Sequence, residues 1–283
     1  MSEAVIRDFE RSSVLRRQYD ERYRIDWCFM KAAPRPCFTP ALLAELASTF
    51  AEYRTQTSLK VDYYVMASDV PGTFNLGGDL ALFQHYIHTR DRAGLLAYAK
   101  TCVDSVYEMS AGMHSETCGI ALVQGDALGG GFECALAADV LIAERGTRMG
   151  LPEILFNLFP GMGAYSLLSR RIGPKAAERM ILSGHLYDAE ELYDMGVIDR
   201  LAEPGEGQRE VYAFLEEEAR RANGARALRA AKRLSNPVSY EELYAITEIW
   251  VDAALNLTER DLRMMERLVK RQSKRAEPVA MSA

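Results

Sequence analysis

The feature that most constrains this chain is a triple glycine between an apolar run and a helix-like run. Gly129–Gly131 follows the β-rich segment Gly119–Val123 and precedes Phe132–Ala138, which favours a helix. Glycine has no Cβ, so its backbone can approach a ligand closely. The first amides of a helix lack partners inside the helix and point outward. The segment therefore predicts a ligand-facing turn, although the Lys-[Ser/Thr] pair of a nucleotide phosphate loop is missing.

Two other segments also carry features of ligand-facing turns or helix starts. Phe74–Asp79 carries two adjacent glycines after the strand-like run Val61–Ala67. Met149–Glu153 ends in Pro152-Glu153, and the proline suits the first position of a helix. Each segment alone also has a structural explanation, as a tight turn or as a carboxylate stabilised by a helix dipole.

The order of elements predicts an α/β protein. Strand, turn and helix patterns alternate over the first 200 residues, as in layered α/β domains. We therefore expect an α/β core with the active site (residues 1–200), a C-terminal helical region that covers the site or forms oligomer contacts (201–275), and a tail (276–283). The further expected strands are Asp26–Lys31 and Val140–Ala143, and the expected helices are Pro40–Tyr53, Ala93–Met109, Glu210–Leu234, Tyr240–Leu257 and Thr258–Lys274.

Composition excludes several classes of function. A net charge of −6 and a pI of about 5.4 argue against a nucleic-acid-binding protein. No apolar run is long enough to insert into a membrane, and the charged N-terminus has no signal-peptide core, so we expect a cytoplasmic location. The five scattered cysteines predict no disulfide framework. His85 and His88 lack further ligands nearby in sequence, so no metal site is expected.

Together, the three segments resemble the crotonase (enoyl-CoA hydratase/isomerase) superfamily. The family pattern is F-x-x-G-x-D, then G-x-x-x-G-G-G-x-E, then P-E followed by P-G-x-G, and it is present here from Phe74 to Gly163. The resemblance covers about Tyr23 to Arg275. It implies a crotonase fold of repeated ββα units with a C-terminal helical region. It also implies a homo-oligomer, because crotonases commonly form trimers or hexamers.

A narrower resemblance points to one subgroup. The runs SDVPGTFNLGGDLALF, LVQGDALGGGFECALAADVLIAE and LPEILFNLFPGMGAYSL look like those of the diffusible signal factor synthases, which make cis-2-unsaturated fatty acids for bacterial signalling. Asn157 and Ala164 stand where ordinary hydratases usually have glycine. The subgroup implies dehydration of a medium-chain 3-hydroxyacyl thioester followed by its hydrolysis. The alternatives are a conventional enoyl-CoA hydratase or isomerase, and a regulatory role in binding a sensor histidine kinase.

The resemblance also implies roles for individual residues. Gly78 and Gly130 would supply the backbone N–H groups that hold the thioester oxygen, and Glu133 and Glu153 would share the acid and base roles. Asp79 is expected mainly as a helix-start residue. Which glutamate is the acid does not follow from sequence. The acyl pocket is expected to involve Leu76, Gly77, Leu128, Gly129, Leu155, Met162, Trp250 and Leu268. No cofactor is expected besides the thioester substrate.

The carrier of the acyl group is open between coenzyme A and acyl carrier protein. No Lys or Arg occurs between Lys60 and Arg90, which favours the carrier protein, although Arg148 could contact coenzyme A phosphates. A basic cluster follows residue 219 and could dock an acidic carrier protein, or could simply be a solvated helix face. Its members are Arg220, Arg221, Arg226, Arg229, Lys232 and Arg233.

Overall fold

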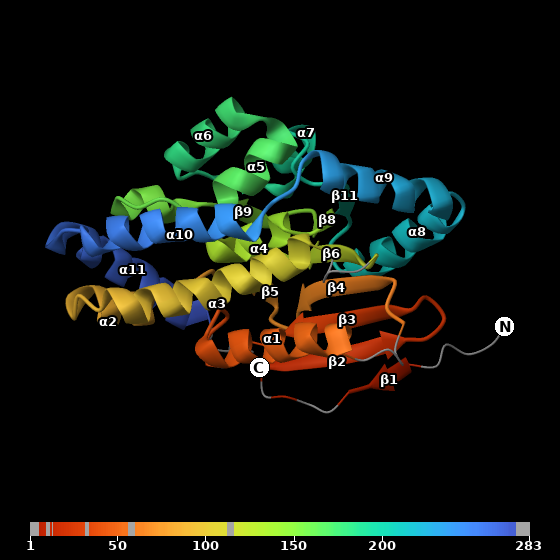
Figure 1. Ribbon diagram of the computed structural model, residues 1–283, viewed down its shortest axis with the longest axis horizontal. Helices are drawn as coiled ribbons and strands as arrows, with labels where there is room; N and C mark the ends of the chain where they lie inside the picture. The colour runs from red at the N-terminus through yellow and green to blue at the C-terminus, as the bar shows by residue number, and fades with distance from the viewer. Residues whose placement is uncertain are drawn as a thin grey trace, which may run out of the picture.

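The larger of two sheets runs through the N-terminal and central parts of the chain. In the computed structural model, which describes residues 6–9, 12, 14–31, 34–55, 60–111 and 116–275, its seven strands have the order β1-β2-β3-β4-β6-β8-β11 (Figure 1). Side chains of residues 268–275 are not described. The first pairings, β1–β2 and β2–β3, are antiparallel, and the pairings from β3 onward are parallel. These strands are β1 (Ile6–Asp8), β2 (Leu15–Asp20), β3 (Ile25–Met30), β4 (Tyr63–Ser68), β6 (Cys118–Val123), β8 (Val140–Glu144) and β11 (Arg200–Ala202).

A smaller sheet of four strands, in the order β10-β9-β7-β5, carries the turns of interest. Its strands are β5 (Gly72–Asn75), β7 (Gly125–Leu128), β9 (Arg148–Gly150) and β10 (Leu186–Asp188). Strands β5, β7 and β9 are mutually parallel, so their carboxyl ends meet at one edge. Each repeating unit gives one strand to the larger sheet and the next strand to the smaller sheet before its helix begins. This is the crotonase arrangement of ββα units that the sequence predicts.

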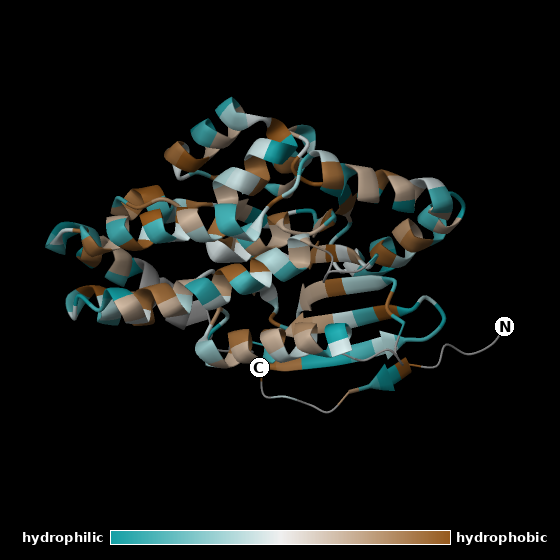
Figure 2. Ribbon diagram, in the orientation of Figure 1, coloured by the Kyte–Doolittle hydropathy of each residue, from teal (hydrophilic) through white to brown (hydrophobic). Residues whose placement is uncertain are grey.

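Helices cover both sheets. The first half contains α1 (Pro40–Thr55), α2 (Leu80–His88), α3 (Arg92–Ser110) and α4 (Gly130–Leu136); the middle contains the 3₁₀ helix η1 (Pro152–Phe156), α5 (Ala164–Ile172), α6 (Pro174–Ser183) and α7 (Ala189–Asp194). Figure 2 shows polar and apolar residues alternating along α3 and α10, as expected for helices with one face on the core. One apolar core lies between α1, α3, α4 and the sheets, and a second lies between the larger sheet and α8.

The C-terminal region is helical: α8 (Gly207–Ala219), α9 (Ala222–Ser235), α10 (Tyr240–Leu255) and α11 (Glu259–Arg275). Helix α10 packs along α3, and α11 packs against α2 and η1, so the chain's end returns to the smaller sheet's carboxyl edge (Figure 1). Thr258 and Asp261 cap α11 reciprocally, because each backbone N–H donates to the other residue's side chain. The division into a core at 1–200 and a helical region at 201–275 stays a prediction, and the expected tail at 276–283 lies outside the described residues.

One predicted helix is wrong, and some strands of the structure were not predicted. The expected helix Glu210–Leu234 is two helices, because the chain turns at Arg220–Arg221 between α8 and α9. The charged run Leu15–Asp20 was not expected to be a strand, yet it is β2. Gly125–Leu128, just before the triple glycine, was not predicted as a strand either, and it forms β7. Among the described residues, no helix is long and apolar enough to span a membrane.

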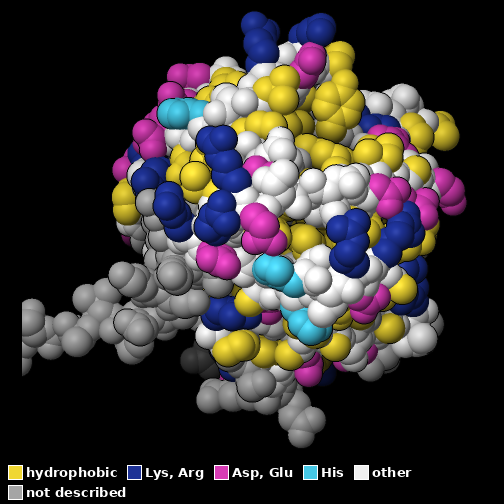
Figure 3. Space-filling view, turned by 90° about the vertical axis from the view of Figure 1, so that its left-hand side faces the viewer, with side chains coloured by type: hydrophobic (Ala, Val, Ile, Leu, Met, Phe, Trp, Pro, Cys, Tyr) yellow, Lys and Arg dark blue, Asp and Glu magenta, His cyan; other side chains and the backbone are white. Residues whose placement is uncertain are grey.

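The surface around α2 and the end of η1 carries mixed charges. In Figure 3, acidic and basic side chains are interspersed on this face, with hydrophobic side chains exposed among them.

Candidate active site

Three turns meet at the carboxyl edge of the smaller sheet. They follow β5, β7 and β9 and contain Gly77–Asp79, Gly129–Gly130 and Leu151–Glu153. Parallel strands bring segments far apart in sequence to a single edge, which is where open α/β sheets bind ligands. A Cβ built on Gly130 would lie 3.4 Å from the nitrogen of Gly78, so the first two turns touch.

The amide of Gly78 is directed by its own peptide group. The carbonyl of Gly77 accepts a hydrogen bond from the Phe38 amide at 2.8 Å. Because a trans peptide is planar, the Gly78 N–H points the opposite way from that carbonyl. Within the described residues this N–H has no acceptor. It is thus available to a ligand in the cavity that Gly78 lines.

The amide of Gly130 is directed in the same way. The carbonyl of Gly129 accepts from the Glu133 amide at 3.0 Å, which is the first bond of α4. The N–H of Gly130 belongs to that peptide and points out of the helix N-terminus. Residue 77 has φ of 91°, and a side chain there would meet the Gly130 nitrogen at 2.9 Å. Glycine at 77 therefore keeps this amide accessible.

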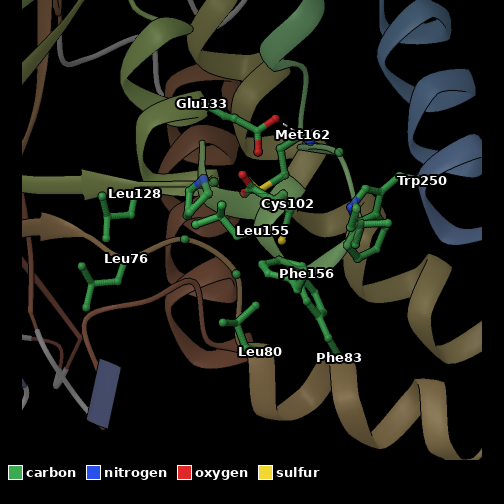
Figure 4. A pocket seen from close by; sticks show the side chains of 18 of the residues that line it. Leu76, Leu80, Phe83, Cys102, Leu128, Glu133, Leu155, Phe156, Met162 and Trp250 are labelled. Atoms are coloured by element: carbon green, nitrogen blue, oxygen red, sulfur yellow. Dashed lines mark hydrogen bonds between the residues drawn. The ribbon is translucent and has the colours of Figure 1, made fainter. Parts of the chain in front are cut away.

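Glu133 lies in the first turn of α4 with only 1% of its surface exposed. Its Oε1 accepts from the amides of Met162 at 2.8 Å and Ala164 at 2.9 Å, across the loop before α5. Figure 4 shows the carboxyl group beside Met162 and facing the cavity. The two amides fix the rotamer and favour the ionised form.

Glu153 follows Pro152 in η1 and faces the same cavity. A Cβ built on Gly129 would lie only 2.4 Å from Glu153 Oε1, so the carboxyl packs against the triple glycine. Its Oε2 is buried and has no hydrogen-bond partner among the described residues, although the residue as a whole is only half-buried. An unpaired buried carboxyl oxygen is costly, and it is typical of a group that receives its partner from a ligand.

The two carboxyls have raised pKa values. Burial raises the pKa of Glu133 to about 7, against the opposing effect of the two amides that bind it. Burial raises the pKa of Glu153 to about 8, and the negative charge of Glu133 raises it further. The two carboxyls titrate as a coupled pair. The first proton is lost from Glu133, because the two amide donors stabilise its carboxylate. Near neutral pH the site holds both an acid and a base.

The groups surround a cavity of about 560 Å³, within the usual range for small-molecule sites. The wall is mostly apolar, and Leu76 and Leu128 lie on one side while Phe83 and Trp250 lie on the other (Figure 4). The rings of Phe83 and Trp250 make an edge contact with centroids 4.9 Å apart. The structure brings together these residues of the predicted site: Leu76, Gly77, Gly78, Leu128, Gly129, Gly130, Glu133, Glu153, Leu155, Met162 and Trp250.

One predicted pocket residue cannot be placed, and another has a structural position. The side chain of Leu268 lies outside the described residues. Asp79 caps α2 by accepting from the Leu82 amide, as expected for a helix-start residue. It also accepts both hydrogen bonds of an Arg35 ion pair at 2.7 Å, which sequence reasoning did not find because the two residues are 44 positions apart.

Charges that could bind a phosphate are few at this site. Arg148 is the one Lys or Arg among the described residues lining the cavity, and it forms an ion pair with Asp126 at 2.9 Å. No cluster of three metal-binding side chains occurs in the part of the chain that the structure describes. The arrangement is suited to acid–base chemistry on a substrate whose developing oxyanion is held by amides.

Residues 30–260 match the family model described as Enoyl-CoA hydratase/isomerase, and the chain belongs to this family. It is 30% identical to the mitochondrial methylglutaconyl-CoA hydratase of Mus musculus over 179 residues, which are 62% of this chain and 55% of that protein. It is 45% identical to a probable enoyl-CoA hydratase of Mycobacterium bovis over 82 residues, 29% of this chain and 32% of that protein. The match thus spans about a third to about half of these relatives.

Solved structures have the same fold. An enoyl-CoA hydratase from Bacillus halodurans superposes with a TM-score of 0.76 at 22% identity, covering 90% of this chain and 100% of that one. DspI from Pseudomonas aeruginosa superposes with a TM-score of 0.65 at 25% identity, covering 80% of this chain and 81% of that one. Identities this low support the fold, while the activity must be argued from the site.

Proposed function

We propose that this protein makes a cis-2-unsaturated medium-chain fatty acid by dehydrating a 3-hydroxyacyl thioester and then hydrolysing the thioester. The observation that carries the proposal is the convergence of two raised-pKa carboxyls, Glu133 and Glu153, on two unpaired amides, those of Gly78 and Gly130. The sequence resemblance to diffusible signal factor synthases selects this reaction within the family.

Dehydration would use both carboxyls. One takes the proton at C2, the C2–C3 double bond forms, and the C3–O bond breaks as the other carboxyl protonates the departing hydroxyl. Charge that develops on the thioester oxygen would be held by the amides of Gly78 and Gly130. Removing one such donor typically costs about 3–4 kcal/mol of transition-state stabilisation. A pair that keeps one proton near neutral pH has the required acid and base at once.

Hydrolysis would use the same groups. One carboxylate takes a proton from water as the oxygen attacks the thioester carbon, and the tetrahedral oxyanion occupies the amide site. The C–S bond then breaks, and the thiol leaves with a proton from the other carboxyl. The products are the free cis-2-enoic acid and the thiol of the carrier.

Acyl carrier protein is the carrier we propose. Coenzyme A carries phosphates that cations usually bind, and Arg148, the one cation lining the cavity among described residues, is already paired with Asp126. The proposed subgroup and the absence of Lys and Arg between positions 60 and 90 support the same choice.

A conventional enoyl-CoA hydratase is the second candidate. It is favoured by the curated relatives, which carry the names methylglutaconyl-CoA hydratase and probable enoyl-CoA hydratase. Both candidates need the same carboxyls and amides, so the released product must separate them.

Product analysis by mass spectrometry tests the proposal. Purified protein is given 3-hydroxyacyl-carrier-protein in one reaction and trans-2-enoyl-CoA in another. Free cis-2-enoic acid from the first reaction is the expected result. Hydration of trans-2-enoyl-CoA without any hydrolysis in either reaction would instead identify a conventional hydratase.

Variants connect the product to the site. Glu133→Gln and Glu153→Gln should each lower turnover by at least about a hundredfold, in keeping with the contribution of general acid–base catalysis. Glu45→Gln, which changes an exposed carboxyl on α1, is the matched control and should retain turnover. Full turnover in both site variants would contradict the proposed roles.

A further inference from the structure

A buried tyrosine hydroxyl bridges the two chain segments that flank the Gly77–Gly78 peptide. Tyr98, on α3, is 6% exposed. Its hydroxyl oxygen accepts from the Asp79 amide at 2.9 Å, and the hydroxyl donates to the Phe38 carbonyl. Burial keeps the pKa of Tyr98 well above its usual range, so the hydroxyl remains protonated and can make both bonds.

The bridged residues are those that orient the Gly78 amide. Phe38 donates its own amide to the Gly77 carbonyl, and that carbonyl shares a peptide plane with the Gly78 N–H. Asp79 is the residue after Gly78. The hydroxyl therefore holds Phe38 on one side and Asp79 on the other, and a shift of either would rotate the N–H that points into the cavity.

Packing above the turn supports the same arrangement. The ring of Phe83 makes an edge contact with Tyr98, with centroids 5.4 Å apart. A Cβ built on Gly78 would lie only 2.5 Å from Cζ of the same ring, so the ring packs directly on Gly78. Tyr98 thus reaches the turn through two hydrogen bonds and through an aromatic neighbour that also lines the cavity.

We propose that Tyr98 is a positioning residue for the oxyanion site, whose hydroxyl sets the direction of the Gly78 N–H through Phe38 and Asp79. The inference rests on the part of the proposed function that dehydration and hydration share, namely a thioester oxygen bound by Gly78 and Gly130. Tyr98 does not line the cavity, and its effect is transmitted through the backbone.

Tyr98→Phe removes the hydroxyl and keeps the ring. Turnover should fall by about tenfold, less than the roughly hundredfold or greater loss of a direct oxyanion donor, with KM nearly unchanged. Tyr53→Phe is the matched control, because Tyr53 also has a buried hydroxyl, bonded to Asp26 away from the cavity. It should leave turnover unchanged even if it lowers the melting temperature as much.

Infrared spectroscopy gives a readout that a purely structural role would not move. A saturated acyl thioester is bound to the Glu153→Gln background, and its carbonyl stretch is compared with that of the free thioester. The binding-induced lowering of the frequency should be smaller when Tyr98→Phe is added. An unchanged frequency and unchanged turnover, with a stability loss equal to that of Tyr53→Phe, would overturn the inference.

A second substitution covers the case in which Tyr98→Phe does not fold. Site-specific 3-fluorotyrosine at position 98 keeps both hydrogen bonds but makes the hydroxyl a stronger donor and a weaker acceptor. The carbonyl frequency should then change in a folded protein, and no change would reject the positioning role. If the Glu153→Gln protein with Tyr98 intact does not lower the carbonyl frequency at all, Gly78 and Gly130 do not form an oxyanion site. A lowered frequency with no cis-2-enoic acid would refute the proposed reaction and leave the role of Tyr98 standing.

Discussion

At the scale of single residues, the site depends on two carboxyls whose environments differ. Glu133 has two amide donors on one oxygen, whereas Glu153 has a buried oxygen with no partner among the described residues. The fold therefore favours the negative charge on Glu133 in the unliganded protein. The second proton remains with the pair because a second negative charge would be repelled by the first.

The raised pKa values predict a stability that depends on pH. The unfolded carboxyls ionise near pH 4.5, but burial raises the folded pKa values to about 7 and about 8. Between these limits the folded protein binds more protons than the unfolded chain, so its stability falls as pH rises. Glu153→Gln removes one ionisable carboxyl and the charge repulsion between residues 153 and 133. The melting temperature of this variant should decline less than that of the parent protein between about pH 5 and pH 8. Parallel curves for the two proteins would contradict the assigned burial.

Sequence identified the glutamates and glycines but not the groups that hold them. The motif predicted Glu133 and Glu153, and the structure places both on one cavity. The amides of Met162 and Ala164 and the hydroxyl of Tyr98 had no sequence signal as partners, because any residue has an amide and a lone tyrosine on a helix is ordinary core. Such contacts depend on tertiary geometry and become visible only in coordinates.

At the scale of elements, the turn after β5 depends on a positive φ at Gly77. Gly77→Ala should cost about 1–3 kcal/mol of stability through backbone strain, and it should also lower turnover. The added methyl would meet the Leu128 carbonyl at 2.8 Å and the Gly130 nitrogen at 2.9 Å, displacing the oxyanion amide. Denaturant unfolding and steady-state kinetics measure the two effects.

The matched control lies at the start of β5, the strand that precedes this turn. Gly72 also has a positive φ, of 68°, but a Cβ there meets nothing within 4 Å. Gly72→Ala should therefore show the strain without a loss of turnover. Equal losses of turnover in both variants would show that backbone strain, and not the contact with Gly130, is responsible.

The basic cluster on α9 is partly structural. Arg229 pairs with buried Glu218 at 2.6 Å, and Arg233 binds Asp139 at 2.7 Å. Reversing the charge of Arg229 should cost about 3–5 kcal/mol, because it leaves Glu218 buried against a like charge. Unfolding measurements would show this loss. A charge-reversed Arg229 variant would therefore change stability and surface charge together, and it does not isolate carrier docking.

Lys232 on the same helix is exposed and suits that test. Lys232→Glu should leave stability within about 0.5 kcal/mol of the parent protein. If an acidic carrier protein docks on this helix, KM for the carrier-protein substrate should rise and its salt dependence should weaken. An unchanged KM would remove the docking hypothesis.

Element prediction succeeded where side-chain periodicity was strong and failed where charges were paired. Strands β4 and β6 are apolar runs, and the sequence located both within two residues. Strand β2 was missed because LRRQYD reads as a solvated segment, yet the partly buried Arg17 forms ion pairs with Asp26 and Glu52. The break between α8 and α9 was missed because Arg220–Arg221 carries no proline or glycine.

At the scale of the whole molecule, the smaller sheet explains why one chain can bring three distant motifs together. Its parallel strands β5, β7 and β9 end at one edge, and α10 and α11 return from the C-terminus to pack beside that edge (Figure 1). Trp250 from α10 completes the cavity wall. The homo-oligomer implied by the family resemblance stays a prediction.

A crystal structure of Glu153→Gln with a bound 3-hydroxyacyl thioester would show whether the two amides and the two carboxyls act on one substrate. We expect the thioester oxygen within hydrogen-bonding distance of the Gly78 and Gly130 nitrogens, with C2 and the 3-hydroxyl beside residues 133 and 153 and the acyl chain in the apolar cavity. A thioester bound elsewhere, or in this cavity with its carbonyl turned away from both amides, would refute the proposed oxyanion site.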